Sequence, residues 1–232
     1  MNTQPIEKLD LRVDGVLQVH SIFHTIQGEG PLTGHSAIFA RLAGCNLQCP
    51  GCDTEYTSKR TKYTVKEMLT EIEQVDEYPG PRKPLVVITG GEPFRQNITP
   101  LCNALIAAGY KVQVETNGTL PPSPGLHDDV LVVCSPKTGK INIAMQARVD
   151  ALKYVVKAGE VCRDGLPTRA LGHGAVPCVA KPPEGYDGVI YIQPMDEKSV
   201  QQNARNMQAA VRSCMANGYV LQIQTHKVAN LE

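Results

Sequence analysis

The stretch Leu85-Val-Val-Ile-Thr-Gly-Gly-Glu-Pro93 decides the fold class of this chain. Its first half is a continuous apolar run rich in β-branched residues, which is typical of a strand covered on both faces. Its second half is a polar turn, and its two glycines allow a close approach of the backbone to a ligand. A buried strand that ends in a polar turn predicts a parallel sheet with a site at the strand ends. Taken alone, the motif is equally compatible with an ordinary structural turn.

Strand-length apolar runs recur along the chain, and helical patterns separate some of them. The predicted strands cover residues 17–23, 37–42, 85–89, 111–115, 130–134, 151–156, 188–192 and 219–224. One helix is predicted after a capping box that begins at Thr64, a second over 97–108, and a third from a Ser199 cap to a Gly218 stop. The third helix is expected to turn these side chains inward: Val200, Ala204, Met207, Val211 and Met215. The alternation of strands and helices indicates an α/β fold with a parallel sheet.

Residues 159–183 interrupt this pattern. The stretch is rich in glycine and proline and has weak periodicity, so it is predicted to be an irregular insertion. No linker is strong enough to divide the chain, and we expect a single domain spanning residues 1–232.

Polar motifs follow several of the predicted strands. They are Glu115-Thr-Asn-Gly118, Ser135-Pro-Lys137, Gln193-Pro-Met-Asp196 and Gln224-Thr-His-Lys227. Because the carboxyl ends of parallel strands share one edge, these motifs are expected to meet at one rim. Each motif is a weak signal by itself, but together they predict a catalytic mouth.

A cysteine-rich loop follows the strand that ends near Leu42. It reads Gly44-Cys-Asn-Leu-Gln-Cys-Pro-Gly-Cys-Asp-Thr54, a C-x3-C-x2-C array of Cys45, Cys49 and Cys52. Thiolates are the protein ligands of iron–sulfur clusters. Three on one tight turn are able to hold three irons of a cubane and leave the fourth iron open to a small molecule. A structural zinc site is the alternative, with His24 or His35 as a distant fourth ligand.

Composition narrows the classes of function. The 232 residues carry 23 Lys and Arg against 23 Asp and Glu, so net charge gives no support for a broad nucleic-acid surface. The N-terminus has no apolar signal core, and no stretch approaches a membrane span. Eight cysteines without an export signal indicate a reducing cytoplasm rather than a disulfide framework. We expect Cys102, Cys134 and Cys214 to be buried hydrophobes, while Cys162 and Cys178 leave open a second metal site.

The cysteine loop joined to Gly-Gly-Glu-Pro resembles the radical S-adenosylmethionine (SAM) superfamily. Further segments resemble the 7-carboxy-7-deazaguanine synthase family: Thr25-Ile-Gln-Gly-Glu-Gly30, Phe39-Ala-Arg-Leu-Ala-Gly-Cys45, Cys52-Asp-Thr54 and the strand-end motifs above. The resemblance spans nearly the whole chain. It implies an incomplete TIM-type barrel of parallel strands with helices outside, a 4Fe–4S cluster, SAM and Mg²⁺. The implied reaction is a radical ring contraction of 6-carboxy-5,6,7,8-tetrahydropterin to 7-carboxy-7-deazaguanine and ammonia, in queuosine and 7-deazapurine biosynthesis.

The resemblance also assigns roles to residues. Cys45, Cys49 and Cys52 are implied cluster ligands, and Thr54 an implied Mg²⁺ ligand. The implied SAM-binding residues are Gly51, Cys52, Asp53, Gly91, Glu115, Asn117, Ser135, Pro136, Lys137, Gln193, Pro194, Met195 and Asp196. The implied substrate-binding residues are Ile26, Gln27, Gly28, Glu29, Arg41, Thr89, His226 and Glu232. The SAM-derived radical performs the chemistry, so no side chain is expected to act as a catalyst alone.

Structural roles compete with several of these assignments. A turn is the alternative for Glu115 and Asn117, a buried structural carboxylate for Glu29, a strand-end ion pair for Arg41, and a surface histidine for His226. The chain continues Val228-Ala-Asn-Leu-Glu232 after Gln-Thr-His-Lys, where close relatives continue with tyrosine, which weakens the assignment of Glu232.

The resemblance further implies an electron donor such as a flavodoxin and a homodimer, with no direct contact to nucleic acid or membrane. Two other functions fit the cysteine loop: a different radical SAM enzyme, such as a glycyl-radical activase, and a metal-binding module without catalysis.

Overall fold

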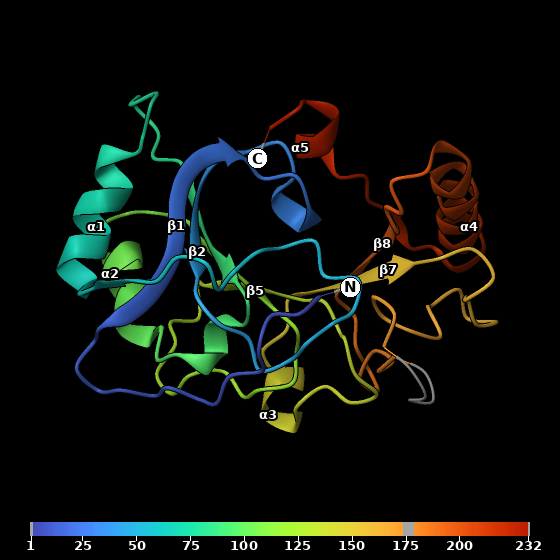
Figure 1. Cartoon of the computed structure of the whole chain (residues 1–232), viewed down its shortest axis with the longest axis horizontal. Coiled ribbons are helices and arrows are strands. Elements are labelled where there is room, and N and C mark those ends of the chain that lie inside the picture. Colours follow the sequence, from blue (N-terminus) through green and yellow to red (C-terminus); the bar gives the residue numbers. More distant parts are fainter. Residues whose placement is uncertain (1, 174–178, 232) are drawn as a thin grey trace.

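The computed structural model of the chain describes residues 2–173 and 179–231. Within these ranges one nine-stranded sheet has the order β3-β1-β2-β4-β5-β6-β7-β8-β9. The strands are β1 (Leu17–Ile26), β2 (Ser36–Leu42), β3 (Thr61–Tyr63), β4 (Leu85–Gly90), β5 (Val112–Thr116), β6 (Leu131–Cys134), β7 (Ala151–Val156), β8 (Val189–Pro194) and β9 (Val220–Leu221). Figure 1 shows the sheet as the centre of the molecule.

The predicted parallel sheet is confirmed from β2 through β9 and is wrong at the β1 end. Each neighbouring pair from β2–β4 to β8–β9 is parallel. β1 pairs antiparallel with both β2 and β3. The short loop between β1 and β2 holds only a 3-10 turn, η1 (Gly30–Leu32), and a parallel return needs a longer crossover. β3 was not predicted because the strand has only three residues and is largely exposed.

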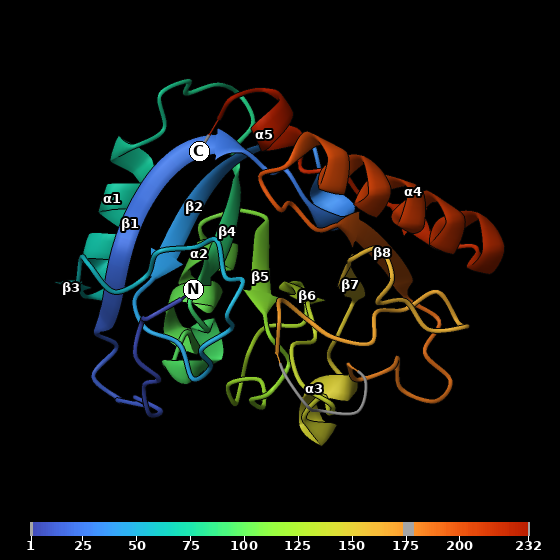
Figure 2. The ribbon, with the colours of Figure 1, turned by 45° about the vertical axis from the view of Figure 1, so that its right-hand side comes forward.

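The sheet curves but does not close. In the described residues β3 and β9 each pair on one side only, so the predicted incomplete barrel is confirmed. Figure 2 shows the arc from β1 round to β8 and the short strand segments along it. The core packs between the sheet and the outer helices, with Ile38, Ile88 and Leu101 fully buried.

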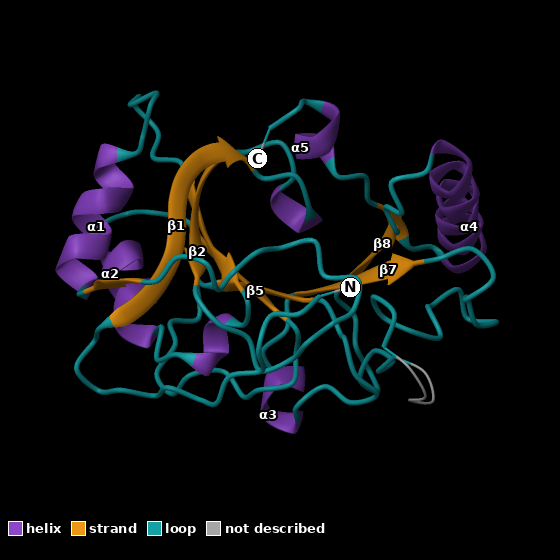
Figure 3. Ribbon diagram, viewed as in Figure 1, coloured by secondary structure: helices purple, strands orange, loops and turns teal. Residues whose placement is uncertain are grey.

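The helices are α1 (Val65–Gln74), α2 (Thr99–Ala107), α3 (Ile143–Gln146), α4 (Val200–Asn217) and α5 (Thr225–Val228), with a 3-10 turn η2 (Pro93–Arg95). Figure 3 shows α1 and α2 together at one end of the sheet and α4 at the other. The capping box of α1 is confirmed, since Glu67 N–H donates to Thr64 Oγ1 and Thr64 N–H donates to the Glu67 carboxylate. Gly218 ends α4 with φ of +72°.

The predicted inward face of α4 is wrong at Val200, Ala204 and Met215, while Met207 and Val211 are partly buried. Val200 and Met215 are 88% and 83% exposed, and Ala204 is also exposed. The buried stripe instead contains Asn206, Ala209, Ala210, Ser213 and Cys214. Burial of its polar side chains is tolerated because they are hydrogen-bonded: Asn206 donates to Met195 O, and Ser213 donates to Gly165 O. An apolar pattern alone does not reveal a stripe that depends on such hydrogen bonds.

Of the predicted insertion at 159–183, residues 174–178, including Cys178, lie outside the described residues. The others contain no helix or strand, and one isolated bridge joins Val161 to Pro167. Cys102, Cys134 and Cys214 are buried as predicted. No helix in the described ranges has the length and apolarity needed to cross a membrane.

Candidate active site

The cysteine loop follows β2 and is held by hydrogen bonds between its own residues. Cys45 and Cys49 are buried, and Cys52 is partly exposed. The loop closes where Gly44 N–H donates to Tyr56 O at 3.0 Å, and Cys52 N–H donates to Cys49 O at 3.1 Å. The ring of Tyr56 is fully buried, and its hydroxyl donates to Leu47 O. Hydrogen bonds and a buried ring therefore support the backbone that carries the three sulfurs.

The N-terminal segment straps this loop, a feature that sequence reasoning missed. Glu7 N–H donates to Cys45 O at 2.7 Å, Asn2 Nδ2 donates to Cys49 O at 3.2 Å, and Gln4 Nε2 donates to Thr54 O at 2.9 Å. Arg95, which is 2% exposed, connects the two segments, because it donates to Lys8 O at 2.9 Å and to Ala43 O at 2.8 Å. These contacts join groups that are distant in sequence, so no local motif predicts them.

The Gly-Gly-Glu-Pro turn at the end of β4 packs directly against the cysteine loop. A Cβ on Gly91 would lie 2.1 Å from Gly44 O and 2.8 Å from Cys45 Cβ. The glycine at position 91 therefore allows the turn to pack closely against the backbone of the cysteine loop. Glu92 N–H donates to Gly44 O, which ties the two turns together.

Glu92 organises the ends of two strands and was not among the predicted site residues. Its buried carboxylate accepts from Phe94 N–H at 3.1 Å, Thr116 Oγ1 at 2.8 Å and Asn117 N–H at 2.7 Å. Burial raises the pKa of Glu92 to about 7, against the effect of these donors. All of these partners donate, so the geometry favours the ionised carboxylate. An acidic residue inside a turn that follows a buried strand is a signal that identifies it.

The donor set suits a cluster better than a single ion. In the described part of the chain, no three His, Cys, Asp or Glu side chains converge as ligands of one metal. In a cubane each cysteine binds a different iron, so the sulfurs need not converge on one point. Burial raises the pKa of Cys45 to about 12 and of Cys49 to about 11, and Leu47 N–H points at Cys45 Sγ from 3.4 Å. Ligation supplies the positive charge that a buried thiolate needs.

Several predicted SAM-binding residues gather beside the loop. A Cβ on Gly51 would lie 3.3 Å from Met195 Cε, so the residue that follows β8 meets the cysteine loop there. Gln193 is 5% exposed, and its buried Oε1 has no hydrogen-bond partner among the described residues. An orphaned buried acceptor of this kind fits a site that a ligand completes.

Lys137 lies at the end of β6. Its ammonium donates to the carbonyl and hydroxyl of Ser135. Burial, together with the charge of Lys153, lowers the pKa of Lys137. No carboxylate in the described ranges lies within ion-pair distance of it. Pro136, between these two residues, is buried.

Asp196 and Asp53 face the last helix rather than the loop interior. Asp196 accepts from Lys198 N–H at 3.0 Å and from Asn203 Nδ2 and Lys227 Nζ, which lower its pKa to about 2. Lys227 Nζ also lies 3.5 Å from Asp53 Oδ2. Pro194, before Met195, is partly buried at the end of β8.

The side chains of Glu115 and Asn117, at the end of β5, contact different parts of the site. Asn117 Nδ2 donates to Asn46 Oδ1 in the cysteine loop at 2.9 Å. Glu115 accepts from Gln27 Nε2 at 3.0 Å and from Thr89 Oγ1 at 3.1 Å. Glu115 therefore joins two predicted substrate residues, although it was predicted to contact SAM.

Glu29 forms a buried ion pair with Lys153 of β7, and Gln224 Nε2 donates to its other oxygen at 2.7 Å. Burial opposes ionisation of Glu29, but Lys153 and Gln224 lower its pKa to about 2. The same carboxylate and Glu115 raise the pKa of Lys153 against the effect of burial. Lys153 was not predicted as a site residue. A charged residue in the middle of the apolar run Ala151-Leu-Lys-Tyr-Val-Val156 is the signal that identifies it.

The remaining substrate candidates line the β1–β2 end of the rim. A Cβ on Gly28 would lie 1.8 Å from His226 Nδ1, so these two residues touch. Burial lowers the pKa of His226, against the opposing charge of Glu29. Arg41 pairs with Thr89 in the β2–β4 register, and its guanidinium lies 5.1 Å from the Phe23 ring centroid. Ile26 is the last residue of β1, and Glu232 lies outside the described residues.

Thr54 closes the cysteine loop on its solvent side. Its hydroxyl donates weakly to Asp53 Oδ1 at 3.4 Å, and its carbonyl accepts from Gln4. Two protein oxygens are too few for a complete magnesium shell, so any Mg²⁺ here needs oxygens from a ligand or water.

Comparisons with known proteins agree with this arrangement. The model of the Radical SAM superfamily matches residues 41–132, which include the cysteine loop and the Gly-Gly-Glu-Pro turn. A 7-carboxy-7-deazaguanine synthase of Rhodospirillum rubrum is 39% identical, over 93% of this chain and 92% of its own. That of Rickettsia prowazekii is 38% identical, over 93% and 89%. A crystal structure of QueE from Escherichia coli has the same fold, with a TM-score of 0.67 at 24% identity over 90% of this chain and 94% of its own.

The open parallel sheet with three cysteines beside its strand ends therefore defines a radical SAM enzyme, which implies a 4Fe–4S cluster and SAM. Within that superfamily, the chain belongs to the 7-carboxy-7-deazaguanine synthase family.

Proposed function

We propose that this enzyme converts 6-carboxy-5,6,7,8-tetrahydropterin to 7-carboxy-7-deazaguanine with release of ammonia, in queuosine and 7-deazapurine biosynthesis. One observation carries the proposal beyond family membership. The strand ends hold two polar networks side by side, one around the cysteine loop and one around Glu115 and Lys153. A cluster site needs a second, separately shaped site for the substrate, and this rim offers both.

In the first network we assign Cys45, Cys49 and Cys52 to the cluster. When bound, the cluster and SAM supply the one-electron chemistry that produces the hydrogen-abstracting radical. The chain's own part is to hold and orient. Lys137 is placed to neutralise the SAM carboxylate, the orphaned Oε1 of Gln193 to accept from a donor of SAM, and Gly51 and Met195 to shape its cleft.

The same role of lining the SAM site is proposed for the residues around these four: Asp53, Gly91, Asn117, Ser135, Pro136, Pro194 and Asp196. Glu115 is proposed to lie where the SAM site meets the substrate site, because it accepts from Gln27 and Thr89. Asn117 acts through Asn46 of the cysteine loop, and Asp196 through Lys227.

In the second network we assign the pterin ring to Gln27, Gly28, Glu29 and Ile26, and the substrate carboxylate to Arg41. A guanidinium binds a carboxylate through two parallel hydrogen bonds. Thr89 and His226 complete the pocket, because Thr89 is fixed by Glu115 and His226 packs on Gly28. Glu232 is kept as a proposed contact on the resemblance alone.

Magnesium is proposed at Thr54, with the substrate carboxylate as a further ligand. Thr54→Ala is then expected to abolish the stimulation of turnover by added Mg²⁺ and to leave the iron and sulfide content unchanged. Turnover measured against Mg²⁺ concentration, with iron analysis of the same samples, checks this. If the Thr54→Ala protein also lost its iron, the result would instead indicate that Thr54 has a structural role in the cysteine loop.

The reaction is tested with reduced, cluster-loaded protein, SAM, Mg²⁺ and the carboxy-tetrahydropterin. Formation of 7-carboxy-7-deazaguanine and ammonia, followed by mass spectrometry, is the expected outcome. 5′-Deoxyadenosine without a deazaguanine product would contradict the proposed substrate while keeping the radical SAM class.

The alternative functions predict different results. A glycyl-radical activase has no need for a carboxylate-binding Arg41 or for the buried Glu29–Lys153 pair. A binding module without catalysis would yield zinc and no acid-labile sulfide from anaerobically prepared protein.

We further propose that the chain is a single domain over residues 1–232, works in the cytoplasm as a homodimer and receives electrons from a flavodoxin-like donor. Exposed apolar residues on and after β9 support an interface between copies, since Val220, Leu221 and Ile223 are each about 40% exposed.

A further inference from the structure

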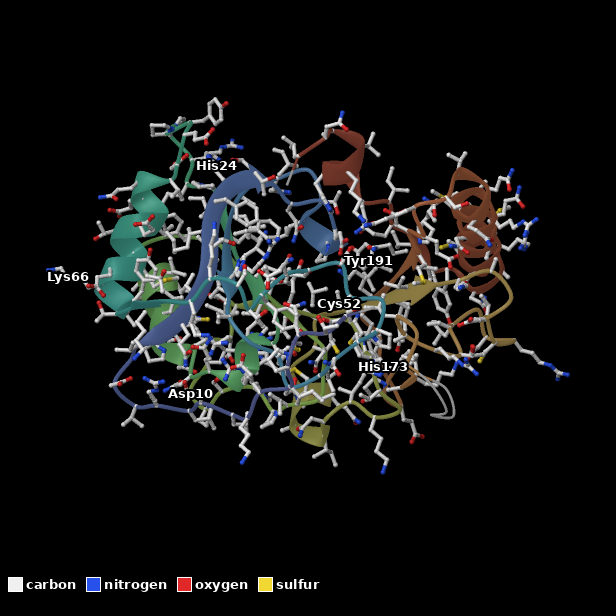
Figure 4. The ribbon with its side chains drawn as sticks, in the orientation of Figure 1. Asp10, His24, Cys52, Lys66, His173 and Tyr191 are labelled. Atoms are coloured by element: carbon white, nitrogen blue, oxygen red, sulfur yellow. The ribbon has the colours of Figure 1, made fainter. Side chains whose placement is uncertain are left out.

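The irregular segment after β7 also contacts the cysteine loop. Gly51 N–H donates to Leu171 O at 2.8 Å, and a Cβ on Gly172 would lie 3.5 Å from Pro50 Cβ. Next to them, His173 Nε2 lies 3.0 Å from Cys49 Sγ. Figure 4 shows His173 on the same side of the molecule as Cys52.

The segment is held firmly enough to place a side chain. Leu166 and Ala170 are buried in the core cluster, and Cys162 N–H donates to Leu166 O at 2.8 Å. Ser213 of α4 donates to Gly165 O at 2.5 Å, and Tyr219 donates to Asp164 O at 2.9 Å. Residues 160–173 are therefore fixed to the outer helix on one side and to the cysteine loop on the other.

The backbone before His173 is strained in a way that these contacts compensate. Leu171 has φ of +48°, a left-handed conformation that is uncommon for a residue with a branched side chain. The Leu171 carbonyl is the group that accepts from Gly51, and Gly172 follows with φ of +78°. This turn directs the imidazole to Cys49.

A nitrogen at 3.0 Å from a thiolate sulfur has one favourable arrangement. The sulfur is an acceptor, so the imidazole donates its Nε2 proton to it. Hydrogen bonds to the sulfurs of an iron–sulfur cluster withdraw negative charge and so favour the reduced form. A donor to Cys49 therefore makes the reduction potential less negative.

We propose that His173 is a positioning residue that donates a hydrogen bond to the Cys49 thiolate and raises the reduction potential of the cluster, with residues 160–173 as its rigid support. The proposal rests on the assignment of Cys49 as a cluster ligand made above. It gives the irregular segment a role in the electron-transfer step, because the ease of reduction decides how readily SAM is cleaved.

The test is an anaerobic redox titration of the cluster-loaded protein, followed by electron paramagnetic resonance. His173→Leu removes the donor. It is expected to keep the iron and sulfide content but to lower the ratio of reduced to oxidised cluster at a fixed potential by about tenfold, which for one electron corresponds to a shift of about 59 mV. His173→Gln places an amide nitrogen near the Nε2 position and is expected to restore most of the ratio. His127→Leu, at an exposed histidine whose Nδ1 accepts from Asp129 N–H, serves as the matched control and is expected to leave it unchanged.

His173→Asn is a second test variant, because the shorter asparagine amide does not reach the Cys49 sulfur. The reduction potential of the cluster in this variant should be lowered as in His173→Leu. An unchanged ratio in both variants with an intact cluster overturns the proposal. So does an equal shift in His173→Gln, or loss of the cluster from all three, since these results would indicate packing or direct ligation. Wild-type protein that takes up no cluster would refute the proposed function instead.

Discussion

Lys153 is the residue around which the substrate half of the site is arranged. It stands in the middle of an apolar strand, where a charge is tolerated only with a partner, and Glu29 is that partner. The pair fixes the position of the Gly28–Glu29 turn, and Gln224 and His226 come to the same turn from the end of the chain. One buried charge therefore brings together residues that are far apart in sequence.

Glu29→Gln is expected to destabilise the fold by about 3–5 kcal/mol at neutral pH, because it leaves Lys153 buried without a counter-charge. The folded-state pKa of Glu29 is lowered from 4.5 to about 2, so its contribution is present above pH 4.5 and is lost as the pH falls toward 2. Urea unfolding of both proteins over this range should show the stability difference narrowing with acidity. The double variant with Lys153→Met should recover part of the loss, and a difference independent of pH would contradict the charge-pair account.

The contact between Gly28 and the His226 ring leads to a second prediction about a single residue. Gly28→Ala inserts a methyl group into the space of the His226 ring and is expected to lower kcat/KM by at least about tenfold, since a small displacement of positioning groups is costly. Steady-state kinetics and iron analysis check it, and the cluster content should not change. Gly80→Ala, where a Cβ meets nothing closer than 3.8 Å, is the control. Equal activity of the two variants would exclude contact between Gly28 and His226 as a determinant of the site.

At the scale of elements, the strand ends are joined by side chains that lie within the turns themselves. Glu92 connects β4 to β5 through Thr116 and Asn117, and Asn117 continues to Asn46 of the cysteine loop. Each strand end is thereby positioned by its neighbour, which makes the rim rigid without long helices after β5 and β6. The outer helix α1 contributes stability through its cap and its buried face, whereas α4 also reaches the rim, where Asn203 donates to Asp196 and Asn206 to Met195 O.

Thr64→Ala tests that separation. Loss of the capping box of α1 is expected to cost about 1 kcal/mol of stability with unchanged kcat and KM. Chemical denaturation and steady-state kinetics are the two measurements. Thr70→Ala, the same change at an exposed position inside α1, should not destabilise the protein. A lower kcat in Thr64→Ala would show that α1 is coupled to the site.

At the scale of the whole molecule, the open sheet brings its last strand close to the turn after its first long strand. Gln222, which is 4% exposed, accepts from Gly30 N–H at 2.7 Å and donates to Gly28 O at 3.1 Å. Thr225 N–H also donates to Gly28 O. These bonds connect the β1–β2 turn to the segment after β9, although β1 and β9 do not pair.

Gln222→Ala is expected to cost about 1–3 kcal/mol, because it leaves the buried Gly30 amide without its acceptor. It should also raise KM for the pterin, since Gly28 and His226 lose their common support, while the iron content stays the same. Thermal unfolding and kinetics are to be compared with Gln208→Ala on the exposed face of α4. Unchanged KM would indicate that the rim does not depend on this closure.

The amino-acid sequence by itself determined the features that local chemistry encodes. The apolar runs predicted the strands β1, β2 and β4 to β9, the Thr64 box predicted the start of α1, and the cysteine spacing predicted the cluster loop. These signals are readable because each depends on residues a few positions apart. The sequence did not reveal β3, the antiparallel direction of β1 or the buried stripe of α4.

Only the tertiary structure decided which distant residues share one site. Lys153 with Glu29, Gln222 with Gly28, the N-terminal strap on Cys45 and His173 on Cys49 all join groups more than thirty residues apart. Such pairs leave no periodic pattern, because burial, hydrogen bonding and charge neutralisation act through space and not along the chain. The spacing of three cysteines was therefore legible from the sequence, and the surroundings that set their chemistry were not.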